Sequence, residues 1–389
     1  MSELNFDETV AVLVASTAEV PANELPRIVA LAGRALGADS ARILVVDYGS
    51  VSLQELGVAG PAGPQQSVDG TLAGRSYVRG EIVVSPDDPT QVWIPLTEEG
   101  ERLGVLELRH SGWDDDMRAA VDVIVRILVL VLVSKRRFTD IMMRSKRARP
   151  LTLAAEMQWD LLPPLTCATG AVSVSGILEP AYTIGGDSFD FAVNPNRAEF
   201  AIVDAVGHGT AAVAMSITAI NGLRNARREG TGIEAAYYTT GDAISAQFGH
   251  SYFVTGQVGA LVPDTGELTW LNAGHPLPLL IRDNSYVGEL SCAPSLPMGL
   301  GGSVAEIATE QLQPGDRVLF FTDGVTEAHS PQGEEFGVAR LADLLVRATL
   351  DRVSTAETVR RLSFSIFTFN HAGLSDDATL LLLDYHGRG

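Results

Sequence analysis

The chain has 389 residues, a net charge of −20 and a hydrophobic share of 46%, which predict a globular protein of roughly two or three domains. Its two cysteines, Cys167 and Cys292, cannot form a disulfide framework, and the N-terminus lacks the pattern of a signal peptide, so we expect a cytoplasmic protein. The overall acidity argues against nucleic acid as the main partner. The most apolar stretch, residues 121–133, contains two charges and is too short to span a membrane.

The first 113 residues show the element order of an α/β domain. Two helices are expected over residues 5–37, and strands with one further helix follow them. The expected strands cover residues 41–48, 52–58, 81–84, 91–96 and 102–108. The motif WIPL at residues 93–96, followed by RLGVLEL at residues 102–108, resembles part of a GAF sensor domain. The resemblance implies a GAF-like sensor over residues 1–113, and a related PAS-like module is the alternative.

Residues 114–165 are expected to form a helical linker. Within residues 117–149, nine basic residues oppose two acidic ones, which indicates a solvated helix face more than a nucleic-acid or membrane site. Apolar residues recur at about 3.5-residue spacing, which is typical of a short coiled-coil seam. The residues of this seam are Ile124, Leu128, Val131, Phe138 and Met142, with Lys135 interrupting them. We therefore expect a homodimer through the linker helix; a helix packed only on its own domain is the alternative.

Residues 166–389 combine short strands, glycine turns and blocks of helices. This pattern predicts an α+β fold in which helices flank an antiparallel β-sandwich. The expected strands cover residues 172–178, 188–193, 199–203, 253–262, 267–272, 277–282, 316–322 and 378–384. The expected helices cover about residues 209–228, 232–248, 337–349 and 354–371.

Four aspartates at strand ends in this region indicate a metal site. They are Asp187, Asp204, Asp323 and Asp376, and glycine flanks most of their motifs. Carboxylates beside glycines that let the backbone approach closely suit a hard divalent cation, and no cysteine or histidine cluster competes with them. The four carboxylates could hold two ions, Mn²⁺ or Mg²⁺, and a water between such ions becomes a nucleophile for in-line attack on phosphorus.

Six motifs in this region resemble those of the metal-dependent serine/threonine phosphatases of the protein phosphatase 2C superfamily, in the SpoIIE/RsbU-like branch. They are GGDSFD at residues 185–190, DAVGHG at 204–209, LNAGHP at 271–276, LPMG at 296–299, FTDGVTEA at 321–328 and DDATL at 376–380. The resemblance implies a phosphatase domain over residues 166–389. It also implies that a phosphorylated STAS-domain anti-anti-sigma factor is the substrate and that the sensor half sets the activity.

Carried over residue by residue, the resemblance implies two metal ions. Asp204, Asp323 and Asp376 would hold one ion, while Asp187, Asp204 and the carbonyl of Ala205 would hold the other. The Cβ of Ala205 could crowd the site, because relatives in the superfamily often have glycine there.

The roles of other residues in the matching motifs are less directly implied by the sequence. Asp377 could replace or support Asp376 as a ligand. Asp190 is expected to be structural. His208 and His275 could either hold their loops by hydrogen bonds or contact phosphate.

A second functional hypothesis is a catalytically silent sensor or scaffold that binds partners through the GAF-like half and the linker helix. The intact set of aspartates argues against it. A nucleic-acid regulator acting through the basic stretch is a third hypothesis, and no recognition-helix motif lies beside that stretch. The sequence does not name the ligand of the sensor.

Overall fold

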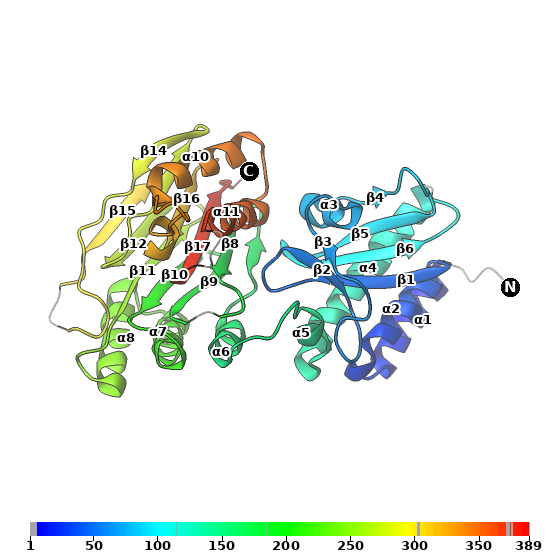
Figure 1. Cartoon of the computed structure of the whole chain (residues 1–389), viewed down its shortest axis with the longest axis horizontal. Helices are drawn as coiled ribbons and strands as arrows, with labels where there is room; N and C mark the ends of the chain where they lie inside the picture. Colours follow the sequence, from blue (N-terminus) through cyan, green and yellow to red (C-terminus); the bar gives the residue numbers. More distant parts are fainter. Residues whose placement is uncertain are drawn as a thin grey trace. The chain divides into compact units, whose positions relative to one another are not determined.

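The computed structural model describes residues 6–113, 115–183, 185–301, 304–370, 374 and 376–388. The chain divides into two compact units, Met1–Pro150 and Leu151–Gly389, which we describe separately (Figure 1). The limits 113 and 165 expected for the sensor, linker and phosphatase domains remain a prediction. In the described part of the chain, we find no helix with the length and apolarity needed to cross a membrane.

The first unit is built on a six-stranded antiparallel sheet with strand order β3-β2-β1-β6-β5-β4. The strands are β1 (Ser40–Val46), β2 (Ser52–Glu55), β3 (Gln66–Ser67), β4 (Val83–Val84), β5 (Gln91–Glu98) and β6 (Glu101–Arg109). The helices are α1 (Phe6–Glu19), η1 (Ala22–Glu24), α2 (Leu25–Ala35), α3 (Leu72–Arg79), α4 (Asp115–Lys135), η2 (Arg136–Phe138) and α5 (Ile141–Ser145).

Side chains of β1 alternate between two apolar clusters, because successive residues of a strand point to opposite faces of the sheet. Ile43 and Val45 join the cluster that α2 and α4 cover. Leu44 and Val46 join a second cluster with Tyr77 of α3. The sheet of this unit therefore has helices packed on both of its faces.

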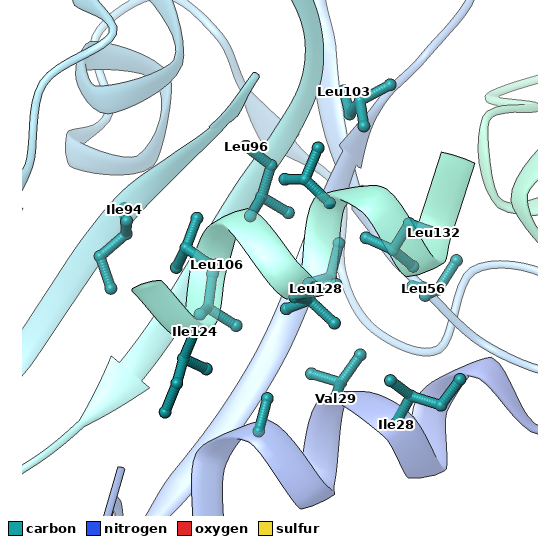
Figure 2. Packing of buried hydrophobic residues seen from close by; sticks show 14 of the residues in the cluster. Ile28, Val29, Leu56, Ile94, Leu96, Leu103, Leu106, Ile124, Leu128 and Leu132 are labelled. Atoms are coloured by element: carbon teal, nitrogen blue, oxygen red, sulfur yellow. The ribbon is translucent and has the colours of Figure 1, made fainter. Parts of the chain in front are cut away.

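In helix α4, expected seam residues are buried within the first unit instead of being free to contact a second chain. Ile124 and Leu128 are buried in the cluster shared with β5, β6 and α2, as Figure 2 shows. The helix ends at Lys135, whose Nζ donates a hydrogen bond to the carbonyl of Val20 at 2.6 Å. The prediction that the residues from Ile124 to Met142 form a short coiled-coil seam is therefore wrong, because Ile124, Leu128 and Met142 are buried in their own unit and the helix ends at Lys135.

The second unit contains two antiparallel sheets. One has the order β15-β12-β11-β10-β9 and the other the order β14-β13-β16-β17-β8-β7. Their strands are β7 (Thr166–Ala168), β8 (Val172–Glu179), β9 (Asp187–Asn194), β10 (Arg197–Ala205), β11 (Val254–Val262), β12 (Glu267–Ala273), β13 (Leu279–Arg282), β14 (Ser285–Glu289), β15 (Ile307–Gln311), β16 (Arg317–Phe321) and β17 (Ala378–Tyr385). Both sheets contribute large side chains to one apolar cluster, among them Phe200 of β10 and Phe320 of β16.

Two helices cover each of these sheets, and the four long helices expected from the sequence are confirmed. Helices α7 (Thr210–Glu229) and α8 (Ile233–Phe248) share an apolar cluster with β10 and β11. Helices α10 (Gly337–Leu350) and α11 (Thr355–Asn370) share another with β16 and β17. Two short helices complete the unit: α6 (Leu153–Leu161) contacts α7, and α9 (Asp323–Thr326) follows β16.

Candidate active site

The site begins with two aspartates on neighbouring strands. Asp187 is the first residue of β9, and the antiparallel register places it directly opposite Asp204 of β10. The carboxylate of Asp187 is buried, and its Oδ2 atom accepts hydrogen bonds from the hydroxyls of Thr322 and Thr379 at 2.7 and 2.6 Å. The strand pairing therefore brings two carboxylates together at one end of the sheet, and the two threonines fix the orientation of one of them.

Burial and mutual repulsion change the protonation of this pair. Burial is the main cause that raises the pKa of Asp187 well above its ordinary value, and the charges of Asp204 and Asp377 add to it. The pKa of Asp204 rises to about 7, again mainly through burial and then through the charges of Asp323, Asp376 and Asp377. These carboxylates lie close enough to repel one another, so the group retains protons near neutral pH unless a cation neutralises it.

Asp323 and Asp376 come from the neighbouring ends of β16 and β17. Asp323 is the first residue of α9, directly after β16, and burial followed by the charge of Asp376 raises its pKa. Asp376 has an exposed side chain and lies shortly before β17. The N–H of Thr379 donates to Oγ1 of Thr322 at 2.9 Å, and the N–H of Thr322 donates to the carbonyl of Thr379 at 3.1 Å. These bonds tie the two strand ends together beneath the acidic group.

Ala205 directs its side chain away from the carboxylates. The methyl group is buried in the apolar cluster that β10 shares with α7 and α8, whereas Asp204 lies on the opposite face of the strand. A Cβ atom at Gly186 would lie 3.0 Å from the carbonyl oxygen of Ala205 and 3.6 Å from Oδ1 of Asp204. The glycine thus leaves room beside these two oxygens, and the expected crowding by the Ala205 Cβ is not what the structure shows.

The carboxylates are not yet arranged around a common point. Within residues 6–113, 115–183, 185–301, 304–370, 374 and 376–388, no group of three or more His, Cys, Asp or Glu side chains is gathered closely enough to hold a metal ion. Asp187 instead accepts hydrogen bonds from two threonine hydroxyls, and Asp376 faces solvent. The donors that meet here are all oxygen atoms, and this chemistry fits a hard divalent cation such as Mg²⁺ or Mn²⁺.

The two histidines of the motifs have different surroundings. His208 is exposed in the loop that follows Asp204. His275 is buried. Its backbone N–H donates to Oδ1 of Asn272 at 2.7 Å, and Nδ2 of Asn272 donates to the backbone carbonyl of His275 at 2.8 Å. Burial lowers the pKa of His275 to about 3, with a contact to the Phe321 backbone acting in the opposite sense. His275 is therefore a buried, neutral residue whose main chain is held by the side chain of Asn272.

Asp190 is structural, as expected, and its contacts link three elements. Its buried carboxylate forms ion pairs with Arg224 and Arg227 of α7, each at 2.7 Å. Nη2 of Arg224 also donates to the carbonyl of Leu161 at 2.6 Å, at the last residue of α6. Arg224 thus connects the end of α6 with β9, three residues after the strand begins at Asp187.

Sequence reasoning missed Thr322 and Thr379, the two hydroxyl donors to Asp187. A signal for them was present, because Thr322 directly precedes Asp323 and Thr379 lies three positions after Asp376. Each threonine therefore shares a strand end with a candidate ligand. Neither contact to Asp187 was visible in the sequence, because Asp187 lies more than a hundred residues away from both.

Comparisons with known proteins bear on the family and the fold of the second unit. The family model "Stage II sporulation protein E (SpoIIE)" matches residues 194–386, which include Asp204, Asp323 and Asp376 but begin after Asp187. The "Phosphoserine phosphatase RsbU" of Bacillus subtilis is 26% identical over 239 residues, which is 60% of this chain and 69% of that protein. "Protein IcfG" of Synechocystis is 32% identical over 108 residues, 27% of this chain and only 17% of that protein.

A solved structure, the SiaA-PP2C domain of Pseudomonas aeruginosa, shares the fold of the second unit with a TM-score of 0.51. It is 20% identical in sequence, and the match covers 60% of this chain and 94% of that one. The mixed α/β fold with its antiparallel sheets is thus that of a PP2C-type domain. Residues 194–386 thus form a domain of the SpoIIE/RsbU-like type within the protein phosphatase 2C superfamily.

Proposed function

We propose that this protein is a metal-dependent phosphatase that hydrolyses phosphoserine or phosphothreonine in proteins. The observation that carries the proposal is the pairing of Asp187 with Asp204 beside Asp323 and Asp376, where burial, followed by the charges of these neighbours, raises the pKa of Asp204 to about 7. Such a group of carboxylates is costly without a cation and suited to one. Membership of the SpoIIE/RsbU-like branch, with a relative named as a phosphoserine phosphatase, supports the same activity.

We infer the ligands from the motifs and the contacts together. Asp204, Asp323 and Asp376 would hold one Mn²⁺ or Mg²⁺ ion, and Asp187, Asp204 and the carbonyl of Ala205 would hold a second. Asp376 and Asp377 both remain candidates for the ligand from the β17 side. When bound, two such ions supply a hydroxide nucleophile at neutral pH and neutralise the phosphate oxygens. The hydroxyls of Thr322 and Thr379 keep Oδ2 of Asp187 occupied and so orient this carboxylate.

For the substrate, we propose a phosphorylated STAS-domain anti-anti-sigma factor, with the first unit acting as a GAF-like sensor. The sequence motifs of the SpoIIE/RsbU-like branch support the substrate. The central sheet of the first unit, with helices on both faces, supports a sensor module.

We also propose a homodimer through the linker helix, using a different face of α4 than the one first expected. Val123 and Leu130 have side chains that are 37% and 58% exposed, and the half-buried Ile127 lies between them. The spacing of four and three residues from Val123 to Ile127 to Leu130 is that of a coiled-coil seam. Ile124 and Leu128, in contrast, are buried in their own unit.

The experiment that tests the proposed activity measures phosphate release from a phosphoserine STAS-domain protein and from a phosphoserine peptide, with and without Mn²⁺. We expect Mn²⁺-dependent turnover that Asp204→Asn abolishes. The matched control is Asp343→Asn, which changes an exposed aspartate paired with Arg347 on α10 and should keep full activity. If Mn²⁺ neither binds at millimolar concentration nor supports turnover, the catalytically silent scaffold becomes the better description.

A further inference from the structure

One carboxylate of the acidic site, that of Asp377, binds a run of backbone amides. Its Oδ2 atom accepts hydrogen bonds from the N–H groups of Gly185, Gly186 and Asp187, at 2.8, 2.6 and 3.2 Å. Successive N–H groups that converge on one point form a concavity that binds an anion. Hydrogen bonds from such groups to an ionised carboxylate are charge-assisted, and they are about twice as strong as bonds between neutral partners.

The other side of this glycine turn is held as well. The carbonyl of Gly186 accepts hydrogen bonds from the hydroxyl of Ser216 and, at 3.4 Å, from the N–H of Ala205. A Cβ atom at Gly185 would lie 2.8 Å from the backbone nitrogen of Gly209, so the turn lies directly against the loop that follows β10. Asp377 therefore binds the N–H groups of the turn, while Ser216 and Ala205 bind its carbonyl, immediately before Asp187 begins β9.

Asp377 is itself held in place. A Cβ atom at Gly324 of α9 would overlap the carbonyl oxygen of Asp377, which means that the two backbones are in close contact. The N–H of Asp377 donates to Oδ1 of Asp376 at 2.9 Å. The segment before β17 is thus packed against α9, and it presents Asp376 and Asp377 in different directions.

We infer that Asp377 is a positioning residue, which holds the Gly185–Gly186 turn so that Asp187 faces Asp204, and that Asp376 is the ligand supplied by this segment. The inference rests on the proposed metal-dependent function. Moving Oδ2 of Asp377 to a cation would leave three N–H groups without their acceptor, which is costly in a partly buried turn. Asp376 has an exposed side chain and can turn toward a cation while giving up one such bond.

Mn²⁺ titration by calorimetry on the full-length protein tests the ligand assignment. Asp376→Asn should bind one ion fewer than the wild type. Asp377→Asn should bind the wild-type number of ions with an affinity reduced by about tenfold or more, because residues that orient ligands typically have effects of that size. The exposed-site control Asp343→Asn should match the wild type. Loss of an ion in Asp377→Asn, or an unchanged affinity, would overturn the inference.

Amide hydrogen exchange in the metal-free protein gives a second readout that needs no activity. With EDTA present, the amides of residues 185–187 should exchange faster in Asp377→Ala than in the wild type, whereas Asp376→Asn should leave them unchanged. If Asp377→Ala does not fold, Asp377→Asn serves in the same comparison. Equal exchange in wild type and both Asp377 variants would contradict the positioning role. A wild-type protein that binds no Mn²⁺ would instead refute the proposed function, and the exchange result would still stand on its own.

Discussion

Asp187 of β9 and Asp204 of β10 are direct cross-strand partners, so two carboxylates lie opposite each other at one end of the sheet. Like charges placed opposite each other destabilise a strand pair, and burial increases the cost. The two aspartates lie at the open end of the hairpin formed by β9 and β10. The predictions below follow from the free energy that this pairing costs and from the groups that surround it.

Replacing Asp204 with Asn should stabilise the metal-free protein while removing its Mn²⁺ response. The raised pKa means that the folded state prefers the protonated Asp204, so the destabilisation is fully present above about pH 7 and disappears as the pH falls toward the ordinary value. At pH 8 with EDTA we expect a gain of roughly 1–3 kcal/mol in the free energy of unfolding. Thermal unfolding at pH 8 and pH 5.5 checks this, and the difference between variant and wild type should shrink at the lower pH.

Mn²⁺ binding should weaken as the pH falls below about 7. The cation and a proton compete for Asp204, whose pKa lies near 7 in the metal-free protein, so binding at pH 6.5 must release protons. Calorimetry in two buffers of different ionisation enthalpy measures the number released. An affinity that stays constant between pH 6 and pH 8, with no proton release, would show that Asp204 is not a ligand.

Replacing Thr379 with Val should weaken metal binding without unfolding the second unit. The hydroxyl of Thr379 donates to Oδ2 of Asp187 at 2.6 Å, and its loss leaves Thr322 as the remaining hydroxyl donor to that atom among the described residues. We expect about a tenfold loss in Mn²⁺ affinity, which is typical for a residue that orients a ligand. Thr379→Ser keeps the hydroxyl and should restore most of the affinity. Equal affinities for the Val and Ser variants would contradict this role.

Replacing Leu130 with Glu should reduce self-association. Leu130 is an exposed apolar residue on α4, and a charge there disrupts the proposed seam without disturbing the buried face that carries Ile124 and Leu128. Light scattering at micromolar concentration should show a dimer for the wild type and a monomer for the variant. Arg347→Glu, a charge reversal at an exposed residue of α10 in the second unit, is the control. A monomeric wild type would refute the dimer.

Much of the second unit could be predicted from its sequence, because its strands and its four long helices have clear periodic patterns. Strands β14 and β15 were missed. Both lie at sheet edges and expose most of their residues, so their sequences, SYVGE and IATEQ, lack the apolar alternation that marks a half-buried strand. The short strand β7 was missed for a related reason, since three residues are too few to show a period.

The sequence predicts the residues of the candidate site but not the contacts among them. The order and spacing of the motifs singled out Asp187, Asp204, Asp323 and Asp376. The distinction between Asp376 and Asp377 depends on hydrogen bonds to residues about 190 positions away, which no local pattern encodes. The coiled-coil seam failed for a similar reason, because a 3.5-residue repeat does not say whether its partner is a second chain or the helix's own sheet.

The link from Arg224 to both Leu161 and Asp190 limits how α6 can move. The guanidinium of Arg224 donates both to the carbonyl of Leu161 at the end of α6 and to the buried carboxylate of Asp190 on β9. Rotating α6 by itself would therefore leave this largely buried cation without one of its acceptors, which is costly. Any displacement of α6 that preserves these bonds must carry α7 and the start of β9 with it. Through Arg224, the position of α6 is therefore coupled to the strand that begins at Asp187.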